Sequence, residues 1–365
     1  MHFFVDDEQR AYAKIQRGSG KECMRIDRKP FSSYLKHLYH KTTNLIATEK
    51  SIISAKELLI ELAEQEGEIH KVFMRVAKHE DKYYIDIGDN TFMVIEVSKL
   101  CWKIIDDSPV YFARTRYFKA LPIPDENGDI DKFWNLVNIE EKYRGLLIAW
   151  MLECFRPDTE YPILELFGGQ DSGKSKTQYF IRQLIDPRTR GLLKTPPQNV
   201  KDDIYIACAN THLLSLNNCT TFSREMQKAL CCVADGGDYE YRKFYTEAET
   251  EIITVMRPCV WSGITNCATE QDLFDRLMSV PLPSLKGTGK KKDAAELDEY
   301  FNENSSGIFG GLLNVFVKAL NELDNINFDE CPPSVKIPDI RFMGFARFGQ
   351  AVYRAMRIAP DDCDW

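Results

Sequence analysis

Short apolar runs alternate with segments of helical periodicity between residues 158 and 285. The run ILELF at 163–167 is apolar at every position except Glu165, which is typical of a strand buried on both faces of a parallel sheet. The segment KSKTQYFIRQLID after it repeats apolar residues every three or four positions, which indicates an amphipathic helix. Further strands are predicted at 211–218, 258–264 and 276–283, and helices at 202–209 and 222–234. This order predicts an α/β fold with a parallel sheet flanked by helices.

The flanking segments follow other patterns. Mixed charges dominate residues 1–40, which favours an exposed surface over a nucleic-acid-binding arm. A helix is predicted at 54–67, short alternating strands fill 70–121, and PIPDENG at 122–128 is typical of a linker. Helices are predicted at 141–155, 307–320 and 342–356. We therefore expect four parts: a small N-terminal α+β domain (1–121), a linker and helical lead-in (122–157), the α/β core (158–285) and a C-terminal helical region (286–365).

Composition restricts the class of protein. Hydrophobic residues make up 44% of the 365 residues, so the chain is globular. The net charge of −8 argues against a wholly basic surface, although one groove can be basic on an acidic body. The eleven cysteines contain no C-x-x-C pair, which favours a reducing compartment. No apolar run reaches membrane-spanning length, so we expect a soluble, intracellular protein that does not bind a membrane.

The sequence GGQDSGKS at 168–175 fits the pattern G-x-x-x-x-G-K-[ST] without a gap. A predicted strand precedes it and a predicted helix follows, which is the context of a phosphate-binding loop. Lys174 is then expected to reach the β- and γ-phosphates of ATP, and Ser175 to bind Mg²⁺. The expected nucleotide-binding residues are Gly168, Gly169, Gln170, Asp171, Ser172, Gly173, Lys174, Ser175 and Lys176.

Hydrolysis of ATP needs a carboxylate near Mg²⁺, normally at the end of a neighbouring strand. The next predicted strand ends at Leu216-Asn217-Asn218, which contains none. The amide oxygen of Asn217 can hold the ion or its water, but it carries no charge and cannot act as a base. Either turnover is weak or an acid comes from elsewhere. Candidates are Asp202, Asp203 and Glu225, whose positions are more typical of surface or helix-capping residues.

Two further polar positions follow in the core. The strand at 258–264 ends in SGITN, which places Ser262 or Asn266 where a side chain can contact the γ-phosphate or the attacking water. Arg276 precedes the last predicted strand. From there an arginine can project into a neighbouring subunit's site as an arginine finger, or form an ion pair with Asp272 or Asp275.

The compact order of loop, polar strand end, predicted hairpin (238–255), polar strand end and arginine resembles the superfamily 3 helicase type of AAA+ ATPase. More closely, the chain resembles the ATPase half of phage and mobile-element primase–helicase-like proteins. Segments such as YYIDIGD, PVYFARTR, ALCCVADGG, RPCVWSGI and FMGFARFG contribute to this resemblance. It implies a P-loop AAA+-like sheet in a ring-forming homo-oligomer. It also implies ATP and Mg²⁺ as cofactors, single-stranded or forked DNA as partner, and the cytoplasm of a bacterial host or phage-infected cell as location.

The chain departs from these relatives at two strand ends. They carry Asp-Asn after the second strand, so Asn217 stands where the metal-holding aspartate belongs. They carry Asn-Gly-Ile on the third strand, which gives Ser262 the sensor position unless Asn266 takes it. In such rings the hairpin grips DNA in the central channel, which makes Arg242 and Lys243 the candidate contacts. The alternative for this hairpin is aromatic core packing with two exposed cations.

Three functions remain compatible with the sequence. The first is an oligomeric ATPase that acts on DNA in phage or mobile-element replication. The second is a nucleotide-binding scaffold or switch with little or no hydrolysis, because Asn217 weakens the metal site. The third is a small-molecule kinase, which fits the long β-rich N-terminal part less well. Whether the protein is an enzyme is thus left open by the sequence, with hydrolysis the favoured outcome.

Overall fold

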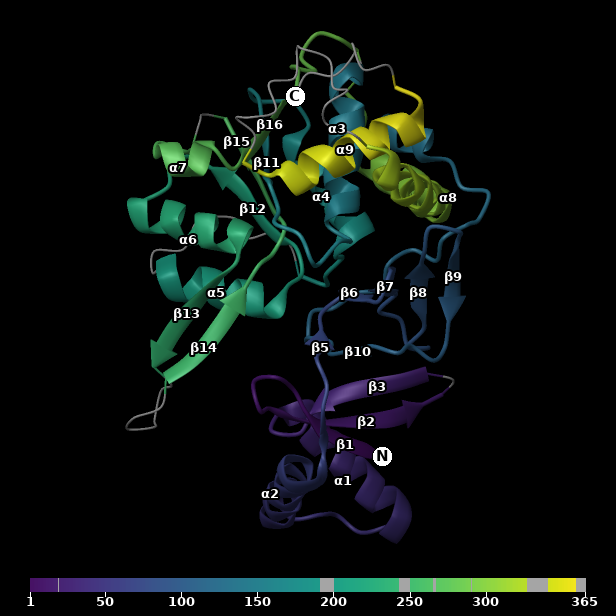
Figure 1. The fold of residues 1–365 in the computed structure, drawn as a ribbon, viewed down its shortest axis with the longest axis vertical. Coiled ribbons are helices and arrows are strands. Elements are labelled where there is room, and N and C mark those ends of the chain that lie inside the picture. Colours follow the sequence, from purple (N-terminus) through teal and green to yellow (C-terminus); the bar gives the residue numbers. More distant parts are fainter. Residues whose placement is uncertain are drawn as a thin grey trace.

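The computed structural model describes residues 1–18, 20–190, 200–242, 250–264, 267–289, 291–326 and 341–358. Three parts are stacked along the longest axis of the molecule (Figure 1). The N-terminal strands and helices lie at one end, a group of short strands lies in the middle, and the α/β core with the C-terminal helices lies at the other end.

The N-terminal unit is a four-stranded sheet covered by two helices. Its elements are β1 (His2–Val5), β2 (Ala11–Arg17), β3 (Gly20–Arg25), α1 (Lys29–Thr43), α2 (Glu49–Glu66) and β4 (Glu68–Ile69), with sheet order β3-β2-β1-β4. Phe31 of α1 and Ala63 of α2 are fully buried against Ala13 and Ile15 of β2. This unit has a hydrophobic core of its own. The segment expected to be mixed-charge surface is therefore part of a folded unit of sheet and helices, and one of its charged residues, Asp6, is fully buried.

The middle strands form an antiparallel meander. The elements are β5 (Val72–Phe73), β6 (Val76–His79), β7 (Lys82–Asp86), β8 (Val94–Val97), β9 (Trp102–Ile105) and β10 (Tyr111–Phe112). Strands β6, β7, β8 and β9 pair in sequence order, and β5 pairs with β10. The Tyr83 ring lies 5.4 Å from that of Phe316, and Trp102 Nε1 donates to Asn314 Oδ1 at 2.8 Å. Both partners belong to the C-terminal region, so side chains on either side of the expected boundary at residue 121 share one core.

Arg75 joins the meander to the α/β core. Its guanidinium is fully buried and lies 3.2 Å from the Asp186 carboxylate at the end of α4. It also donates to the backbone carbonyls of Asp86 at 2.9 Å and Lys119 at 2.8 Å. A buried charge is tolerated only when paired and hydrogen-bonded, and these contacts meet that requirement across 111 residues of sequence.

The core contains a parallel sheet in the order β12-β15-β11-β16. A lead-in of η1 (Ile130–Asn135), η2 (Glu141–Tyr143) and α3 (Arg144–Glu153) precedes it. The core elements are β11 (Ile163–Phe167), α4 (Lys174–Ile185), α5 (Val200–Asn210), β12 (Leu214–Cys219), α6 (Arg224–Asp235), β13 (Gly237–Arg242), β14 (Thr250–Val255), β15 (Cys259–Gly263), α7 (Gln271–Phe274) and β16 (Leu277–Pro281). The predicted fold class, a parallel α/β sheet flanked by helices with a small N-terminal α+β part and a C-terminal helical region, is confirmed.

Alternation along the strands decides which residues face α4. Gln178 of α4 donates to the Ser215 hydroxyl at 2.9 Å, so Ser215 of β12 faces this helix. Two residues further on, Asn217 lies on the same face. On the other face, Phe222 packs edge-on against Trp261, with ring centroids 5.0 Å apart. The predicted phosphate-binding loop between β11 and α4 thus shares one face of the sheet with Asn217.

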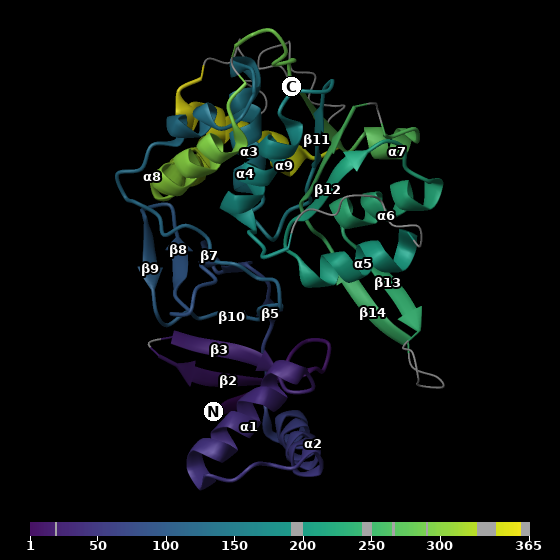
Figure 2. The same cartoon turned by 180° about the vertical axis from the view of Figure 1, so that it is seen from behind.

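The remaining elements are a hairpin and the C-terminal helices. Strands β13 and β14 pair antiparallel, as predicted, and project from the core beside α5 in both views (Figures 1 and 2). The C-terminal elements are α8 (Ala294–Glu322), η3 (Leu323–Asn325) and α9 (Met343–Met356). Helix α8 starts 13 residues before the predicted 307 because Asp293 caps it and its first turns are polar. No helix among the described residues is long and apolar enough to cross a membrane.

A candidate nucleotide-binding site at the carboxyl ends of the strands

The loop between β11 and α4 is held in place from outside. Asn138, in the lead-in, donates to the carbonyl oxygens of Ser172 at 2.9 Å and Pro283 at 2.7 Å. Gly173 has φ +81°, and a Cβ on Gly168 would lie 2.6 Å from the Leu282 carbonyl oxygen. Both glycines are therefore required by geometry. No local sequence pattern indicates Asn138, because its contacts to Ser172 and Pro283 depend on long-range folding.

The Lys174 ammonium turns back over the loop. Its Nζ donates to the carbonyl oxygens of Gly168 and Gly169, each at 2.6 Å, and lies 3.2 Å from Ser172 Oγ. Partial burial lowers the pKa of this lysine. The cation thus lies over the backbone that is expected to surround a phosphate, held by weak neutral acceptors. A phosphate oxygen is a stronger, charged acceptor and can replace them.

Three polar side chains from three different elements meet beside the loop. Ser175 Oγ, in the first turn of α4, donates to Asn217 Oδ1 at 3.1 Å. Ser262 Oγ, on β15, donates to the same oxygen at 2.8 Å. The sequence assigned these residues separately to the metal, the strand end and the sensor position. All three side chains offer oxygen atoms, which are the ligands that Mg²⁺ prefers.

A β-bulge directs Asn217 toward the loop. Leu216 pairs with Trp261 and Cys219 pairs with Gly263, so Asn217 and Asn218 together oppose Ser262. Asn218 has φ +56°, a left-handed conformation that asparagine tolerates better than most residues. Bulges are common beside active sites because they redirect a side chain. The strand end is therefore shaped around Asn217.

The carboxylates considered for the missing acid lie in other surroundings. Glu165 of β11 is buried, but it accepts from Trp261 Nε1 at 3.1 Å and Ser279 Oγ at 2.6 Å on the face away from α4. Asp203 and Glu225 are exposed on helices, and Glu225 lies in the first turn of α6, where an acid favours the helix dipole. The side chain of Asp202 lies outside the described residues.

Other predicted loop residues have separate partners. Asp171 forms an ion pair with Lys291 at 2.7 Å, and Lys176 forms one with Asp298 of α8 at 2.8 Å. Gly169 and Gln170 are exposed, and a Cβ on Gly169 would meet no atom within 4 Å. These contacts join the loop to the C-terminal region.

Arg276 is buried at the other end of the strands, beside the start of β11. Its carbonyl oxygen accepts from Ile163 N, at the start of β11, whereas the phosphate-binding loop follows the other end of that strand. The guanidinium pairs with Asp235 and with Asp272, the latter at 2.7 Å. Arg276 therefore does not contact the loop of its own chain. The ion pair expected with Asp272 is present, whereas Asp275 instead accepts from Gln271 at 2.7 Å.

Three sequence-derived candidates cannot be placed in full. Arg242 ends β13, but its side chain lies outside the described residues, as do Lys243 and Asn266 entirely. Their roles stay predictions.

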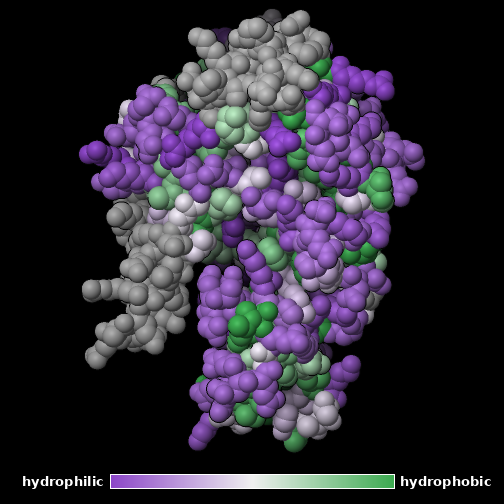
Figure 3. All heavy atoms as spheres, viewed as in Figure 1, coloured by the Kyte–Doolittle hydropathy of each residue, from purple (hydrophilic) through white to green (hydrophobic). Residues whose placement is uncertain are grey.

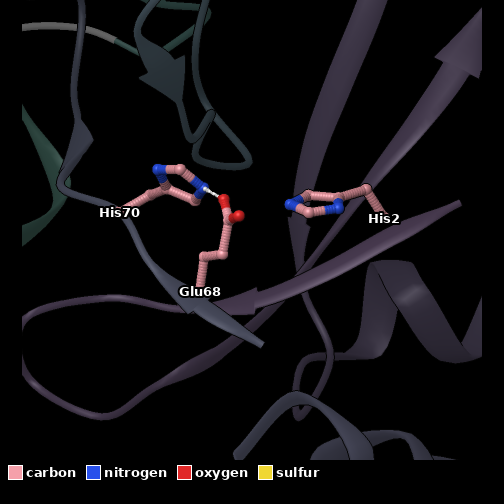
Figure 4. Close-up of side chains that lie close together, drawn as sticks. All are labelled: His2, Glu68 and His70. Atoms are coloured by element: carbon pink, nitrogen blue, oxygen red, sulfur yellow. Dashed lines mark hydrogen bonds and ion pairs between the residues drawn. The ribbon is translucent and has the colours of Figure 1, made fainter. Parts of the chain in front are cut away.

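A further group of possible metal ligands lies in the N-terminal unit, where His2, Glu68 and His70 bring their ligand atoms within 4.8 Å of one another (Figure 4). His70 Nε2 and Glu68 Oε2 are 2.9 Å apart and form a hydrogen bond without any ion. His2 and Glu68 are exposed. The sequence did not point to this group, because Glu68 and His70 are far from His2 along the chain.

Solved structures provide comparisons. The NrS-1 C terminal region matches with TM-score 0.47 and 12% identity over 85% of this chain and 65% of that one. A JCV helicase structure matches with TM-score 0.30 and 13% identity over 64% of this chain and 62% of that one. This chain thus spans less than two thirds of either. Because both TM-scores are below 0.5, the fold assignment rests on the sheet topology. No curated protein matches.

A family profile identifies the chain. The profile described as actinomycete integrative conjugative element replication protein matches residues 130–344, more than half of the sequence. The matched region includes the lead-in with Asn138, the predicted phosphate-binding loop, the bulged strand, the hairpin and helix α8. An integrative conjugative element is a mobile element, in agreement with the mobile-element part of the expectation. The chain belongs to the family of actinomycete integrative conjugative element replication proteins.

Proposed function

We propose that this replication protein is an oligomeric, helicase-type ATPase that binds Mg·ATP and acts on single-stranded or forked DNA, with slow hydrolysis. The observation that supports this most is the meeting of Ser175, Asn217 and Ser262 beside the phosphate-binding loop. Phosphate-binding loops occur in many proteins, but a metal-binding hydroxyl, a strand-end amide and a sensor hydroxyl within hydrogen-bond reach form a site for phosphoryl transfer.

Each residue has a distinct role in this proposal. The backbone N–H groups of Gly169–Ser175 bind the phosphates, and Lys174 leaves its carbonyl partners to neutralise the β- and γ-oxygens. Ser175 and Asn217 provide oxygen ligands for Mg²⁺, which would neutralise charge that develops on the γ-phosphate. Ser262 orients Asn217 and can donate to the γ-phosphate or to the attacking water. Since Asn217 is uncharged, hydrolysis is expected to be slow.

The DNA contacts are assigned to the projecting hairpin. Arg242 ends β13 and Lys243 follows it in the sequence, and in a ring's channel such cations can bind DNA phosphates. Arg276 of each subunit would complete its neighbour's site, provided that assembly releases it from Asp235.

The second candidate function is a switch or scaffold in which ATP binds without turnover. The amide at Asn217, with no carboxylate near it among the described residues, favours this alternative. It predicts the same ATP affinity and the same dependence on Lys174.

One experiment separates these functions. ATP turnover is measured with and without single-stranded DNA, beside a sizing column run with Mg·ATP. We expect an oligomer at a multiple of 42.1 kDa and slow turnover that DNA stimulates. An oligomer that binds ATP without turnover would favour the switch. A monomer whose turnover does not change with DNA would contradict both proposed functions.

A further inference from the structure

A second concave site lies at the far end of α4 from the phosphate-binding loop. It is a cleft of about 410 Å³ between the segment after β10, the end of α5 and the start of the edge strand β12. Figure 3 shows the molecule hollowed between the α5 side and the middle strands. Helix α4 has twelve residues, so about 18 Å separates its two ends. The cleft is therefore not part of the nucleotide site.

Four arginines line this cleft: Arg116, Arg182, Arg188 and Arg190. Three of them surround one aromatic ring, because the guanidinium carbons of Arg116, Arg188 and Arg190 lie 5.8, 5.9 and 5.4 Å from the centre of the Tyr117 ring. A short backbone pairing holds this group together: Phe118 bridges to Arg188, and Thr189 N donates to the Tyr117 carbonyl oxygen at 3.0 Å. The cations are thus gathered by the fold.

Among the described residues that line the cleft there is no carboxylate to neutralise its positive charge. The nearest buried acid, Asp186, already accepts from Arg75, Thr211 and two backbone N–H groups. Arg182 is about nine-tenths buried, and its Nε has no hydrogen-bond partner among the described residues. Burial lowers the pKa of Arg182 to about 10 and also lowers that of Arg188. Asp186 attracts Arg182 and Arg188, but one carboxylate cannot neutralise four arginines. Keeping these cations close together therefore costs stability, which an anion in the cleft would recover.

The shape and chemistry indicate which anion fits. Guanidinium groups bind phosphate oxygens in pairs, and four of them spread over one cleft can follow successive phosphates of a strand. Tyr117 is half-buried and Ile206, at the rim, is 51% exposed, so apolar surface lies beside the cations. Unpaired bases stack on such an apolar surface, whereas inorganic phosphate makes no favourable contact with it.

We infer that this cleft binds the phosphodiester backbone of a single-stranded nucleic acid, at a site separate from both the hairpin and the nucleotide. The inference shares with the proposed function the premise that the protein contacts DNA, but it requires neither ATP binding nor hydrolysis. It gives the ATPase core a second contact, on its outer edge, through which a strand can be held.

The test measures binding of a fluorescent single-stranded oligonucleotide without nucleotide, over a series of salt concentrations. The variant Arg188→Ala with Arg190→Ala removes two cations that contribute no hydrogen bond to the fold among the described residues. The matched control, Arg28→Ala with Lys50→Ala, removes the same charge from exposed positions in the N-terminal unit. Thermal unfolding of each variant verifies that it is folded. Inorganic pyrophosphate serves as the small-anion competitor.

We expect the cleft variant to bind the oligonucleotide at least fivefold more weakly than the control. Its salt dependence should be shallower by about 1.4, the slope for two phosphate contacts on a single strand. Tyr117→Ala should weaken binding further, and Tyr117→Phe should not. Equal affinities and slopes in variant and control would overturn the inference. Loss of pyrophosphate binding with unchanged oligonucleotide binding would also overturn it, in favour of a free-phosphate site. Because no ATP is present, absence of turnover leaves this result intact.

Discussion

Ser262 and Asn217 are joined by a hydrogen bond of 2.8 Å from the serine hydroxyl to the amide oxygen. The two residues lie on neighbouring parallel strands, and the bulge at Asn217 brings them together. The same oxygen accepts from Ser175. If Asn217 Oδ1 turns to bind Mg²⁺, its hydrogen bond from Ser262 changes, and the Ser262 hydroxyl becomes able to donate to another group. The proposed sensor and metal positions thus share one acceptor atom.

ATP affinity should depend on Lys174. Lys174→Ala removes the cation above the loop but leaves the backbone and the Asn138 buttress in place. We expect at least a tenfold weaker ATP affinity by calorimetry, about 1.4 kcal/mol, with the fold kept. Lys291→Ala, which removes a nearby lysine paired with Asp171, is the control and should bind nearly as wild type. Unchanged binding in Lys174→Ala would remove the basis for a nucleotide site.

DNA binding through the hairpin should be electrostatic. Arg242→Ala with Lys243→Ala is expected to weaken binding of single-stranded DNA and to make its salt dependence shallower. Combining these changes with the cleft variant should give additive losses of binding free energy if the two sites act independently. If hairpin variant and wild type share one affinity and one salt slope in a filter-binding assay, the hairpin is not a DNA contact.

Stability should fall as the pH falls from about 6.5 to about 4, because of His212. Burial lowers the pKa of His212 to about 4, and its Nε2 lies 2.6 Å from the Cys154 carbonyl oxygen. Between these pH values the unfolded chain binds a proton that the folded chain does not, so acid favours unfolding by up to about 3 kcal/mol.

Urea titrations at pH 7 and pH 5 measure this dependence. His212→Gln should show a smaller difference between the two pH values than wild type does. Asp186 does not confound the comparison, since its pKa is lowered by Arg75 despite burial and its stabilisation is lost only in stronger acid. An equal pH dependence in the variant would mean that another group titrates.

Arg276→Ala separates the two roles of that arginine. The change leaves Asp235 with Arg341 as its remaining cation, at 2.7 Å, and should lower the free energy of unfolding by about 1–3 kcal/mol. Loss of stability alone supports a purely structural ion pair. If Arg276 also acts as a finger, mixing inactive Arg276→Ala with inactive Lys174→Ala protein should restore turnover, because some interfaces then hold both intact residues.

Sequence patterns predicted the core best where the determinants are local. The loop, the strand before it and the helix after it are contiguous, so their arrangement follows from one motif and its flanks. The proximity of Ser175, Asn217 and Ser262 could also be predicted from the sequence, because the carboxyl ends of parallel strands lie on one side of a sheet.

Contacts between distant segments could not be predicted in this way. Arg75 and Asp186 are 111 residues apart, and neither has a local pattern that indicates a buried pair. Strand β2 buries Ala11, Tyr12 and Ala13 in succession, which hides the alternation expected of a strand. The arginine cleft combines segments near 116, 182 and 190, so only the folded chain shows it.

The missing carboxylate at Asn217 gives the sharpest test of the proposed function. Asn217→Asp adds a charge with almost no change in volume, at an oxygen already directed at Ser175. Turnover at saturating ATP and Mg²⁺ should rise by an order of magnitude or more, since about 1.4 kcal/mol of transition-state stabilisation is enough. Asn218→Asp, one residue along the same bulge, is the matched control: it adds the same charge on an exposed side chain and should not raise turnover. Brisk wild-type turnover with a neutral or harmful Asn217→Asp would mean that another residue supplies the acid. If both proteins bind ATP but hydrolyse none, the nucleotide is a switch, because restoring the charge alone then fails to restore catalysis.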